Sequence, residues 1–467
     1  MILKEFLDEV RRGNIDIQDY TAKAIEETKK IDKEHNYINV ISEELAHSQA
    51  KKSSGKLKGL LITVKDNICV KDVESTAGSK ILKGYSPRFN ATVIQKLVDE
   101  GAIVLGKTSM DEFGFGSFNT NVGVGFRTPT NPHNSSRVTG GSSGGSAGIT
   151  AKTNFVHASI AESTGGSIES PASFCGVVGF CPTYGRVSRY GLISYANSLD
   201  KIGPMTKSIE DSAFLLDFMC GHDSKDSTSL NESSDFNNFS SFVSKPVKGM
   251  KIGIVSEAFG EGVDESVKKS ALDSIKNLES KGCKIEKISL TFVQKYSLAV
   301  YYLLATAEAS TNLACFSGLR YGAEGEIKGL HFDDYFTKIR TENFGEEAKR
   351  RIMLGTFARM SGYRAEYYLK ATKIRTKIIE EYKKALKKVD CLITPTMPIV
   401  APKFDEVKKL TPLQNYMMDV LTVGPSLAGL PHASVPVGKA KNLPVGMQII
   451  SDHFQEGKVI QMGSGLK

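Results

Sequence analysis

A stretch dense in glycine and serine constrains this chain more than any other feature. Residues 140–167 contain seven glycines and six serines, concentrated in two runs, Gly-Gly-Ser-Ser-Gly-Gly from Gly140 and Thr-Gly-Gly-Ser from Thr164. Glycine inside a regular helix or strand costs roughly 0.5–1 kcal/mol relative to alanine, so packing alone does not favour such runs. Apolar residues between and after the runs argue against a flexible linker, which would be polar throughout. The pattern indicates backbone that approaches another group closely.

The rest of the chain has the pattern of an α/β protein. It has 467 residues, of which 40% are hydrophobic, enough for a large core. Apolar β-branched runs alternate with helical periodicity, so we expect one α/β domain over residues 1–467, with a mixed, mostly parallel sheet between helices on both faces. Expected strands span residues 60–64, 102–106, 250–255, 283–290, 390–396, 433–437 and 445–450. Expected helices span residues 91–100, 208–219, 267–281, 292–316, 344–361, 365–388 and 413–423.

Two segments are expected on the surface of this domain. Residues 1–32 carry apolar side chains at helical spacing on both sides of a Gly-Asn break, which predicts a helical hairpin. Residues 222–244 are rich in serine, aspartate and asparagine and nearly free of aliphatic side chains, which predicts an exposed polar excursion within the domain.

Composition argues against several classes of protein. The 60 basic and 52 acidic residues give a net charge of +8 but are spread along the chain, so they permit contact with nucleic acid without indicating it. Seven cysteines form no CxxC pair and eight histidines no HExxH motif, so we expect reduced thiols, no zinc and a cytoplasmic location. No run of 18 apolar residues occurs and the first residues are too acidic for a leader, so we expect neither a membrane span nor a targeting peptide.

The second glycine run has residue types that a serine hydrolase needs. Such an enzyme uses a nucleophile, a base that takes its proton, and donors for the oxyanion. The N–H groups of Thr164, Gly165 and Gly166 can line one wall around an oxygen, and the next residue, Ser167, is the candidate nucleophile. No GxSxG elbow surrounds it, and the nearest histidine is His157, so a histidine base is not obvious.

Lys65 is the candidate base. It directly follows the apolar run at residues 60–64, where burial can hold its amine neutral. The alternative is that Lys65 reaches the surface or pairs with Asp66. A second hydroxyl between the long amine and the nucleophile would define the proton path, and the first glycine run offers Ser142 and Ser143 for that position.

A P-loop pattern also occurs and is discounted. Residues 101–108 fit GxxxxGK[ST] letter for letter. A P-loop follows a strand and opens a helix, with its N–H groups around phosphate. Here the residues between the glycines are themselves an apolar strand, and Gly101 ends the preceding helix, so we expect no nucleotide site.

The motifs together resemble the amidase signature family, whose enzymes use a Ser–cis-Ser–Lys triad. The resemblance covers the whole chain and rests on GGSSGG, on TGGSI followed by Pro-Ala, and on Lys-Asp-Asn after an apolar strand. Runs from Ser173, Pro182 and Ser198 resemble the family branch of A subunits of glutamyl-tRNA(Gln)/aspartyl-tRNA(Asn) amidotransferases. The resemblance implies the amidase-signature fold, with Ser167 as nucleophile, Ser142 as bridging serine in a cis peptide, and Lys65 as base.

Three further positions resemble the glutamine pocket of that branch. They are Tyr301 (or its neighbour Tyr302), Arg351 and Asp419. Arg351 would bind the α-carboxylate of glutamine, Asp419 its α-ammonium, and Tyr301 would close the pocket. From the residues alone, Arg351 would be a helix-surface charge and Asp419 a solvated carboxylate.

The sequence departs from the family pattern beside the nucleophile. The family usually has aspartate before TGGS and arginine after GGSI, whereas this chain has Ser163 and Glu169. Glu162 precedes Ser163, and the interval from Ser142 to Ser167 is one residue longer than expected. We hypothesise that Glu162 partly replaces the missing aspartate.

The resemblance implies a glutaminase subunit that supplies ammonia to convert Glu-tRNA(Gln) to Gln-tRNA(Gln), Asp-tRNA(Asn) to Asn-tRNA(Asn), or both. It implies no cofactor in this chain, ATP and magnesium in a B subunit that also makes most tRNA contact, and a small C subunit that wraps their junction. Two alternatives remain, a stand-alone amidase for small amides and a weakly active or inactive scaffold subunit. The charged pocket residues argue against the first, and the intact triad argues against the second.

Overall fold

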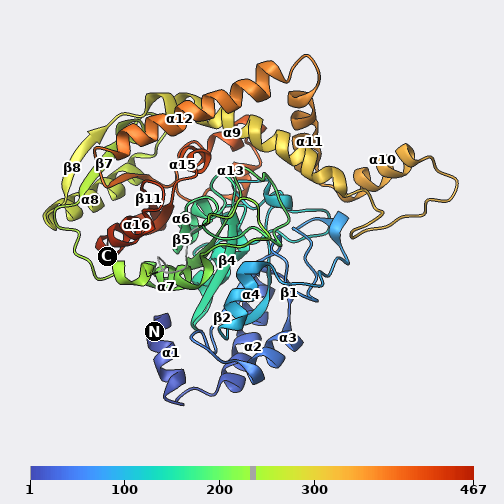
Figure 1. Ribbon diagram of the computed structural model, residues 1–467, viewed down its shortest axis with the longest axis horizontal. Coiled ribbons are helices and arrows are strands. Elements are labelled where there is room, and N and C mark those ends of the chain that lie inside the picture. The colour runs from blue at the N-terminus through green and yellow to red at the C-terminus, as the bar shows by residue number, and fades with distance from the viewer. Residues whose placement is uncertain (1, 232–237, 467) are drawn as a thin grey trace.

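The computed structural model describes residues 2–231 and 238–466, and within them eleven strands form one sheet (Figure 1). The strand order is β1-β3-β2-β4-β6-β5-β10-β11-β9-β7-β8. The strands are β1 (Ile38–Ile41), β2 (Leu61–Lys65), β3 (Ile103–Thr108), β4 (His157–Ser163), β5 (Val178–Cys181), β6 (Lys201–Thr206), β7 (Lys251–Val255), β8 (Lys284–Ile288), β9 (Cys391–Pro395), β10 (His432–Ala440) and β11 (Leu443–Ile450).

Pairing in this sheet is mixed, as predicted, but parallel pairs do not dominate. Among the described residues, four neighbouring pairs are parallel, in the groups β3-β2-β4 and β8-β7-β9. The other six pairs are antiparallel. The expectation of a mostly parallel sheet is therefore corrected. The alternation of strands and helices that suggests parallel pairing belongs mainly to these two groups, while short central strands such as β5 and β6 carry little periodicity.

Helices cover both faces of the sheet, as expected. Successive residues of β2 pack against different helices: Ile62 and Val64 face the helices at residues 3–11, 92–99 and 209–219, whereas Leu61 faces those at residues 17–35 and 43–52. The helices are α1 (Leu3–Arg11), α2 (Ile17–His35), α3 (Glu43–Lys52), α4 (Thr92–Asp99), α5 (Gly144–Lys152), α6 (Glu169–Cys175), α7 (Ile209–Met219), α8 (Glu265–Ser280), α9 (Thr291–Asn312), α10 (Phe332–Asn343), α11 (Glu346–Arg359), α12 (Lys370–Leu386), α13 (Phe404–Val407), α14 (Pro412–Met417), α15 (Val423–Ala428) and α16 (Glu456–Gly465).

The first glycine run opens a helix that packs very closely on its neighbours. A Cβ on Gly145 would lie 2.5 Å from the carbonyl oxygen of Tyr37, and one on Gly148 would lie 2.2 Å from the ring of Tyr37. Only glycine permits this approach, which compensates for its low helix propensity. The density of glycine in this run thus follows from the close packing of α5.

Several predicted elements differ from the observed ones. The helix expected at residues 413–423 is two short helices, α14 and α15, because the chain turns between Met418 and Thr422. Helix α10 is not among the predicted helices. The structure has α1 and α2 where a helical hairpin is expected, with the rings of Phe6 and Tyr20 4.9 Å apart. Part of the polar excursion expected at residues 222–244 lies outside the described residues, and the remainder includes a 3-10 turn at Phe239–Phe242.

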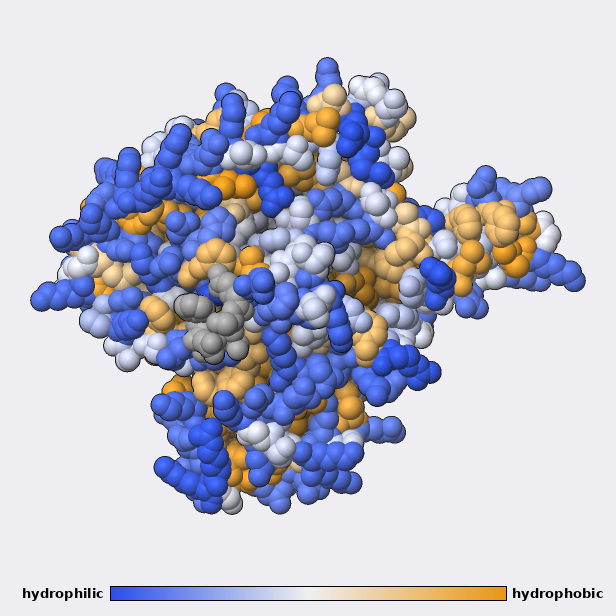
Figure 2. Space-filling model, viewed as in Figure 1, coloured by the Kyte–Doolittle hydropathy of each residue, from blue (hydrophilic) through white to orange (hydrophobic). Residues whose placement is uncertain are grey.

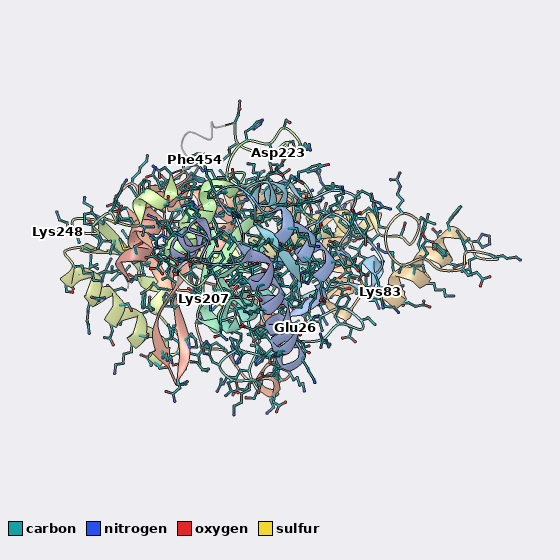
Figure 3. The ribbon with its side chains drawn as sticks, turned by 90° about the horizontal axis from the view of Figure 1, so that it is seen from below. Glu26, Lys83, Lys207, Asp223, Lys248 and Phe454 are labelled. Carbon is teal, nitrogen blue, oxygen red and sulfur yellow. The ribbon has the colours of Figure 1, made fainter. Side chains whose placement is uncertain are left out.

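The molecule has a protruding segment at one end, formed by α10 and the loop before it (Figure 1). Hydrophobic side chains gather on its surface (Figure 2), among them Ile327, Leu330 and Phe332, which is 64% exposed. Lys248, which precedes β7, and Lys83 lie toward opposite ends of the long axis (Figure 3). None of the described helices combines the length and apolarity that crossing a membrane requires.

Candidate active site

Lys65 and Ser142 are in direct contact. Lys65 ends β2, which is buried along its whole length, and its own side chain is 0% exposed. Its Nζ lies 2.7 Å from Ser142 Oγ, and the peptide bond between Gly141 and Ser142 is cis. The structure therefore has the cis serine and brings it to the amine. The alternative in which Lys65 reaches the surface is wrong, and so is a pairing with Asp66, which instead faces Lys107.

Glu162 is a second partner of the same amine. Its Oε2 and its carbonyl oxygen each lie 2.9 Å from Lys65 Nζ. Asn67 donates to the same Oε2 at 3.0 Å, and Thr164 Oγ1 lies 2.7 Å from Oε1. The carboxylate, which is 1% exposed, therefore lies beside the candidate base and not beside Glu169. If Glu162 replaces the family's aspartate, as hypothesised, it does so through its contact with Lys65.

Ser167 closes the short loop between β4 and α6. Its carbonyl oxygen accepts the N–H of Ser143 at 3.2 Å, so the two glycine runs lie side by side. A Cβ on Gly165 would lie 2.5 Å from the ring of Tyr301, and one on Gly166 would lie 2.3 Å from Thr422 Oγ1. Within the described residues, the N–H groups of positions 164–167, which include the predicted Thr164, Gly165 and Gly166, donate to no backbone acceptor. They are therefore free to donate to an oxyanion.

Arg351 is buried, so its interpretation as a helix-surface charge is wrong. It is 3% exposed; its Nε donates to Glu347 at 2.8 Å and its Nη1 to the hydroxyl of Tyr195 at 2.7 Å. Four aromatic rings surround the guanidinium at 5.1–5.8 Å. These contacts fix the planar group and leave its Nη2 edge for a carboxylate.

Asp419 is also removed from solvent, with 9% exposure, so it is not a solvated carboxylate. The hydroxyl of Tyr302 donates to its Oδ2 at 2.7 Å. Burial raises the pKa of Asp419, although hydrogen bonds from Tyr302 and Ser117 favour the ionised form. Tyr301 faces the nucleophile loop while Tyr302 holds Asp419. The two tyrosines therefore have different contacts, and the assignment of either to a glutamine pocket stays a prediction.

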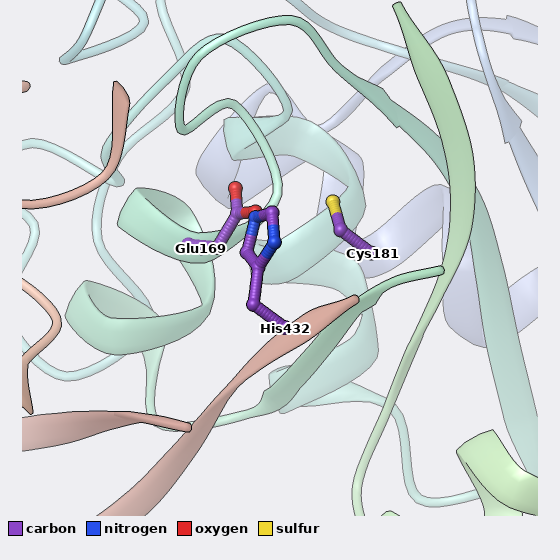
Figure 4. Close-up of side chains that lie close together, drawn as sticks. All are labelled: Glu169, Cys181 and His432. Carbon is purple, nitrogen blue, oxygen red and sulfur yellow. The ribbon is translucent and has the colours of Figure 1, made fainter. Parts of the chain in front are cut away.

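The unusual residues Ser163 and Glu169 contact one another. Ser163 Oγ donates to Glu169 Oε2 at 3.0 Å, and the N–H of Ile168 donates to the same oxygen at 3.2 Å. His432 Nε2 contacts the other oxygen, and Cys181 lies beside both (Figure 4). Burial opposes ionisation of Glu169, but the charge of His432 and its hydrogen bond outweigh burial and lower the pKa to about 2.

Glu169, Cys181 and His432 have donor atoms close enough to consider a metal ion. The contacts favour a different arrangement. Glu169 and His432 touch directly, with no space for an ion between them, and the charge of the buried Lys201 acts on Glu169 and Cys181. An ammonium beside the donors disfavours a cation. The cluster is therefore a buried contact between Glu169 and His432 that joins the start of α6 to the start of β10.

A cleft of about 810 Å³ opens beside the site. Its wall includes Arg351, Tyr416 and Ser117. The carbonyl oxygen of Ser117 accepts the N–H of Gly141 at 2.8 Å, so this wall is continuous with the backbone that carries Ser142. The cleft is suited to admit a small polar molecule to Arg351.

The P-loop pattern at residues 101–108 leads into β3, which covers residues 103–108, so most of the pattern is a strand as expected. Lys107 is 0% exposed, and its Nζ donates to Ser75 Oγ at 2.7 Å and lies 3.5 Å from Asp66 Oδ1. Burial lowers the pKa of Lys107 although the charge of Asp66 opposes this. Its amine thus contacts buried protein groups and is not available to bind a phosphate.

Sequence reasoning missed two residues that the geometry places next to the site. Glu347 lies four residues before Arg351 on α11, and this helical spacing is the signal that could have identified it. Asp200 contacts Thr164 Oγ1 at 2.9 Å, and it occurs in the Ser-Leu-Asp run that begins at Ser198. The partner of Asp200, by contrast, is 36 residues away in the sequence, so no local pattern identifies it.

Comparisons with known proteins agree with this arrangement. The family model for Amidase matches residues 19–460. The glutamyl-tRNA(Gln) amidotransferase A subunit from Thermoanaerobacter pseudethanolicus is 44% identical over 99% of this chain and 95% of its own length. The same subunit from Koribacter versatilis is 46% identical over 96% and 95%. The crystal structure of the Thermotoga maritima subunit superposes with a TM-score of 0.82 at 36% identity, over 99% of this chain and 93% of that one.

Proposed function

The chain belongs to the amidase family, and we propose that it is the glutamine-hydrolysing A subunit of a tRNA-dependent amidotransferase. The contact between Lys65 Nζ and Ser142 Oγ at 2.7 Å is the observation that carries this proposal. It supplies a base and a relay hydroxyl beside the loop that contains Ser167. The curated relatives at about 44% identity supply the expected substrate class.

The neighbours of Lys65 Nζ define how the amine can act as a base. Two of its three contacts are to oxygens of Glu162 that can only accept. A neutral amine has two hydrogens for these acceptors, which leaves its lone pair for the hydroxyl proton of Ser142. Ser142 can then accept the proton of Ser167 as that oxygen attacks the amide carbon of glutamine.

The remaining steps reuse the same groups. The new C–O bond leaves a negative charge on the amide oxygen, which the N–H groups of positions 164–167 stabilise. The C–N bond then breaks as the ammonium of Lys65 returns its proton through Ser142 to the leaving nitrogen, which departs as ammonia. Water attacks the glutamyl ester along the same proton path and releases glutamate. Glu162 favours the ammonium that forms in between because its charge is opposite.

The pocket chemistry suits free glutamine. The free edge of Arg351 binds the α-carboxylate and Asp419 the α-ammonium, while the ring of Tyr301 covers the nucleophile loop. A small aliphatic amide offers these two buried charges nothing to bind. The charges therefore favour a glutaminase over a general amidase.

We assign the later steps to partner subunits. ATP, magnesium and most contact with misacylated tRNA belong to a B subunit in this proposal, and a C subunit lies where the two larger chains meet. Exposed apolar side chains on and near the α10 protrusion, including Phe332 and Met353, support an assembled form, because surfaces of this kind are usually covered by a partner. A cytoplasmic location remains part of the proposal.

The proposal is tested by the choice of substrate. The chain is purified with its partner subunits, and ammonia release is measured from glutamine and from simple aliphatic amides, with and without misacylated tRNA and ATP. Preference for glutamine, increased by tRNA and ATP, supports the coupled glutaminase. Efficient turnover of simple amides by the chain alone would support a stand-alone amidase.

A further inference from the structure

The hydroxyl of Thr164 lies between two buried carboxyl groups. Its Oγ1 is 2.7 Å from Glu162 Oε1 and 2.9 Å from Asp200 Oδ1, and all three residues are at most 1% exposed. A hydroxyl has one proton, so it donates to one carboxyl oxygen only. With both carboxyls ionised, one of these contacts would join two oxygens with no hydrogen between them. One carboxyl must therefore carry a proton.

The neighbours of Glu162 identify it as the ionised partner. Its Oε2 accepts from Lys65 Nζ and from the amide of Asn67. These are donors, and the amine becomes a cation when it takes the proton of Ser142. A carboxylate anion matches this side of the site better than an acid.

Asp200 has the opposite surroundings. The N–H of Tyr195 donates to its Oδ2 at 3.0 Å, and the N–H of Ala196 lies 3.0 Å from both Oδ2 and Oδ1. An acid with its proton on Oδ1 still accepts both N–H groups at Oδ2. Among the described residues, no basic side chain lies within salt-bridge distance of Asp200; Arg189 and Lys201 act on it only from farther away. The charged group that faces it across Thr164 is Glu162.

We propose that Asp200 is a protonated carboxylic acid at neutral pH and a positioning residue for the base. It donates to Thr164, which in turn donates to Glu162, and Glu162 holds Lys65. The chain of contacts also fixes Thr164, the first residue of the loop that leads to Ser167. Burial raises the pKa of Asp200 well above its usual range, and the charge of Glu162 adds to this effect. This inference rests on the proposed function only where activity is measured.

The protonation state is measured directly by infrared difference spectroscopy on the full chain. The spectrum of Asp200→Asn is subtracted from that of the wild type at neutral pH, with both proteins folded by circular dichroism. The proposal predicts a carboxylic acid C=O band in the wild type that the variant lacks. A difference spectrum with only a lost carboxylate band overturns the proposal, whatever substrate the enzyme uses.

Kinetics test the positioning role. In Asp200→Asn the amide nitrogen can donate to Thr164 as the acid does, so kcat for glutamine should stay within about threefold of wild type. Asp200→Ala and Thr164→Val break the chain and should lower kcat roughly tenfold with KM unchanged, while Thr164→Ser restores it. If folded Asp200→Asn loses as much kcat as Asp200→Ala, Asp200 acts as an acceptor and the proposal is wrong.

Discussion

The carboxylate of Glu162 lies 2.9 Å from the amine of Lys65, in a place where both side chains are at most 1% exposed. Charge in such surroundings interacts strongly because little water screens it. Glu162 therefore acts on the one group that must gain and lose a proton in each cycle. This contact distinguishes the site from one in which burial alone controls the lysine.

Removing the Glu162 carboxylate should lower turnover. In Glu162→Ala the ammonium that forms on Lys65 loses its countercharge, so kcat for glutamine should fall about 10²-fold with a small change in KM. Ammonia release by the assembled complex measures this. Glu279→Ala, an exposed change on α8, is the control and should match wild type. Near wild-type turnover in Glu162→Ala would show that the contact does not assist the base.

Arg351 should control affinity for the α-carboxylate. Lysine cannot reproduce the planar fork, so Arg351→Lys should weaken glutamine binding by about 1.5–3 kcal/mol, roughly 10–100-fold in KM. The surface change Arg320→Lys serves as the matched control. Turnover of a simple amide that lacks the carboxylate should change little. A variant with normal KM for glutamine would place the carboxylate elsewhere.

Removing the hydroxyl of Tyr302 should change KM more than removing that of its neighbour Tyr301. Tyr302→Phe removes the donor to Asp419. It should weaken glutamine binding by about 1.5 kcal/mol, which raises KM roughly tenfold. Tyr301→Phe keeps the ring against Gly165 and should affect KM less. Steady-state kinetics of both variants measure and compare their KM values for glutamine. A larger KM effect from Tyr301→Phe would reverse these assignments.

Glu112 should make stability depend on pH. Burial raises its pKa to about 7 from an ordinary 4.5, although Ser79 and the N–H of Gly345 donate to it. The folded state therefore keeps the proton to higher pH than the unfolded state. Protonated Glu112 therefore adds up to about 3 kcal/mol to the free energy of unfolding. This contribution is complete below pH 4.5 and is lost as the pH rises through 7.

Urea unfolding at about pH 5 and pH 8, on either side of the folded-state pKa, checks the effect of Glu112. Wild type should lose more stability over this interval than Glu112→Gln, whose amide resembles the protonated acid. An equal loss in both proteins would mean that Glu112 does not contribute.

Much of the site could be predicted from sequence because its parts are local. Lys65 directly follows a buried strand, and the glycine runs mark close backbone approach. The partners of Glu162 and Glu169 could not be predicted, because β4, α6 and β10 meet only in the folded sheet. Mostly parallel pairing was wrong for a similar reason: short strands such as β5 and β6 are defined by their neighbours, not by periodicity.

Ammonia release from glutamine by the assembled wild-type complex and by Ser167→Ala tests the central claim most directly. The account predicts that the variant assembles normally, binds glutamine and releases no ammonia above background, because the hydroxyl that forms the glutamyl ester has been removed. Retention of wild-type release in Ser167→Ala would contradict the assignment of Ser167 as the nucleophile and with it the proposed mechanism.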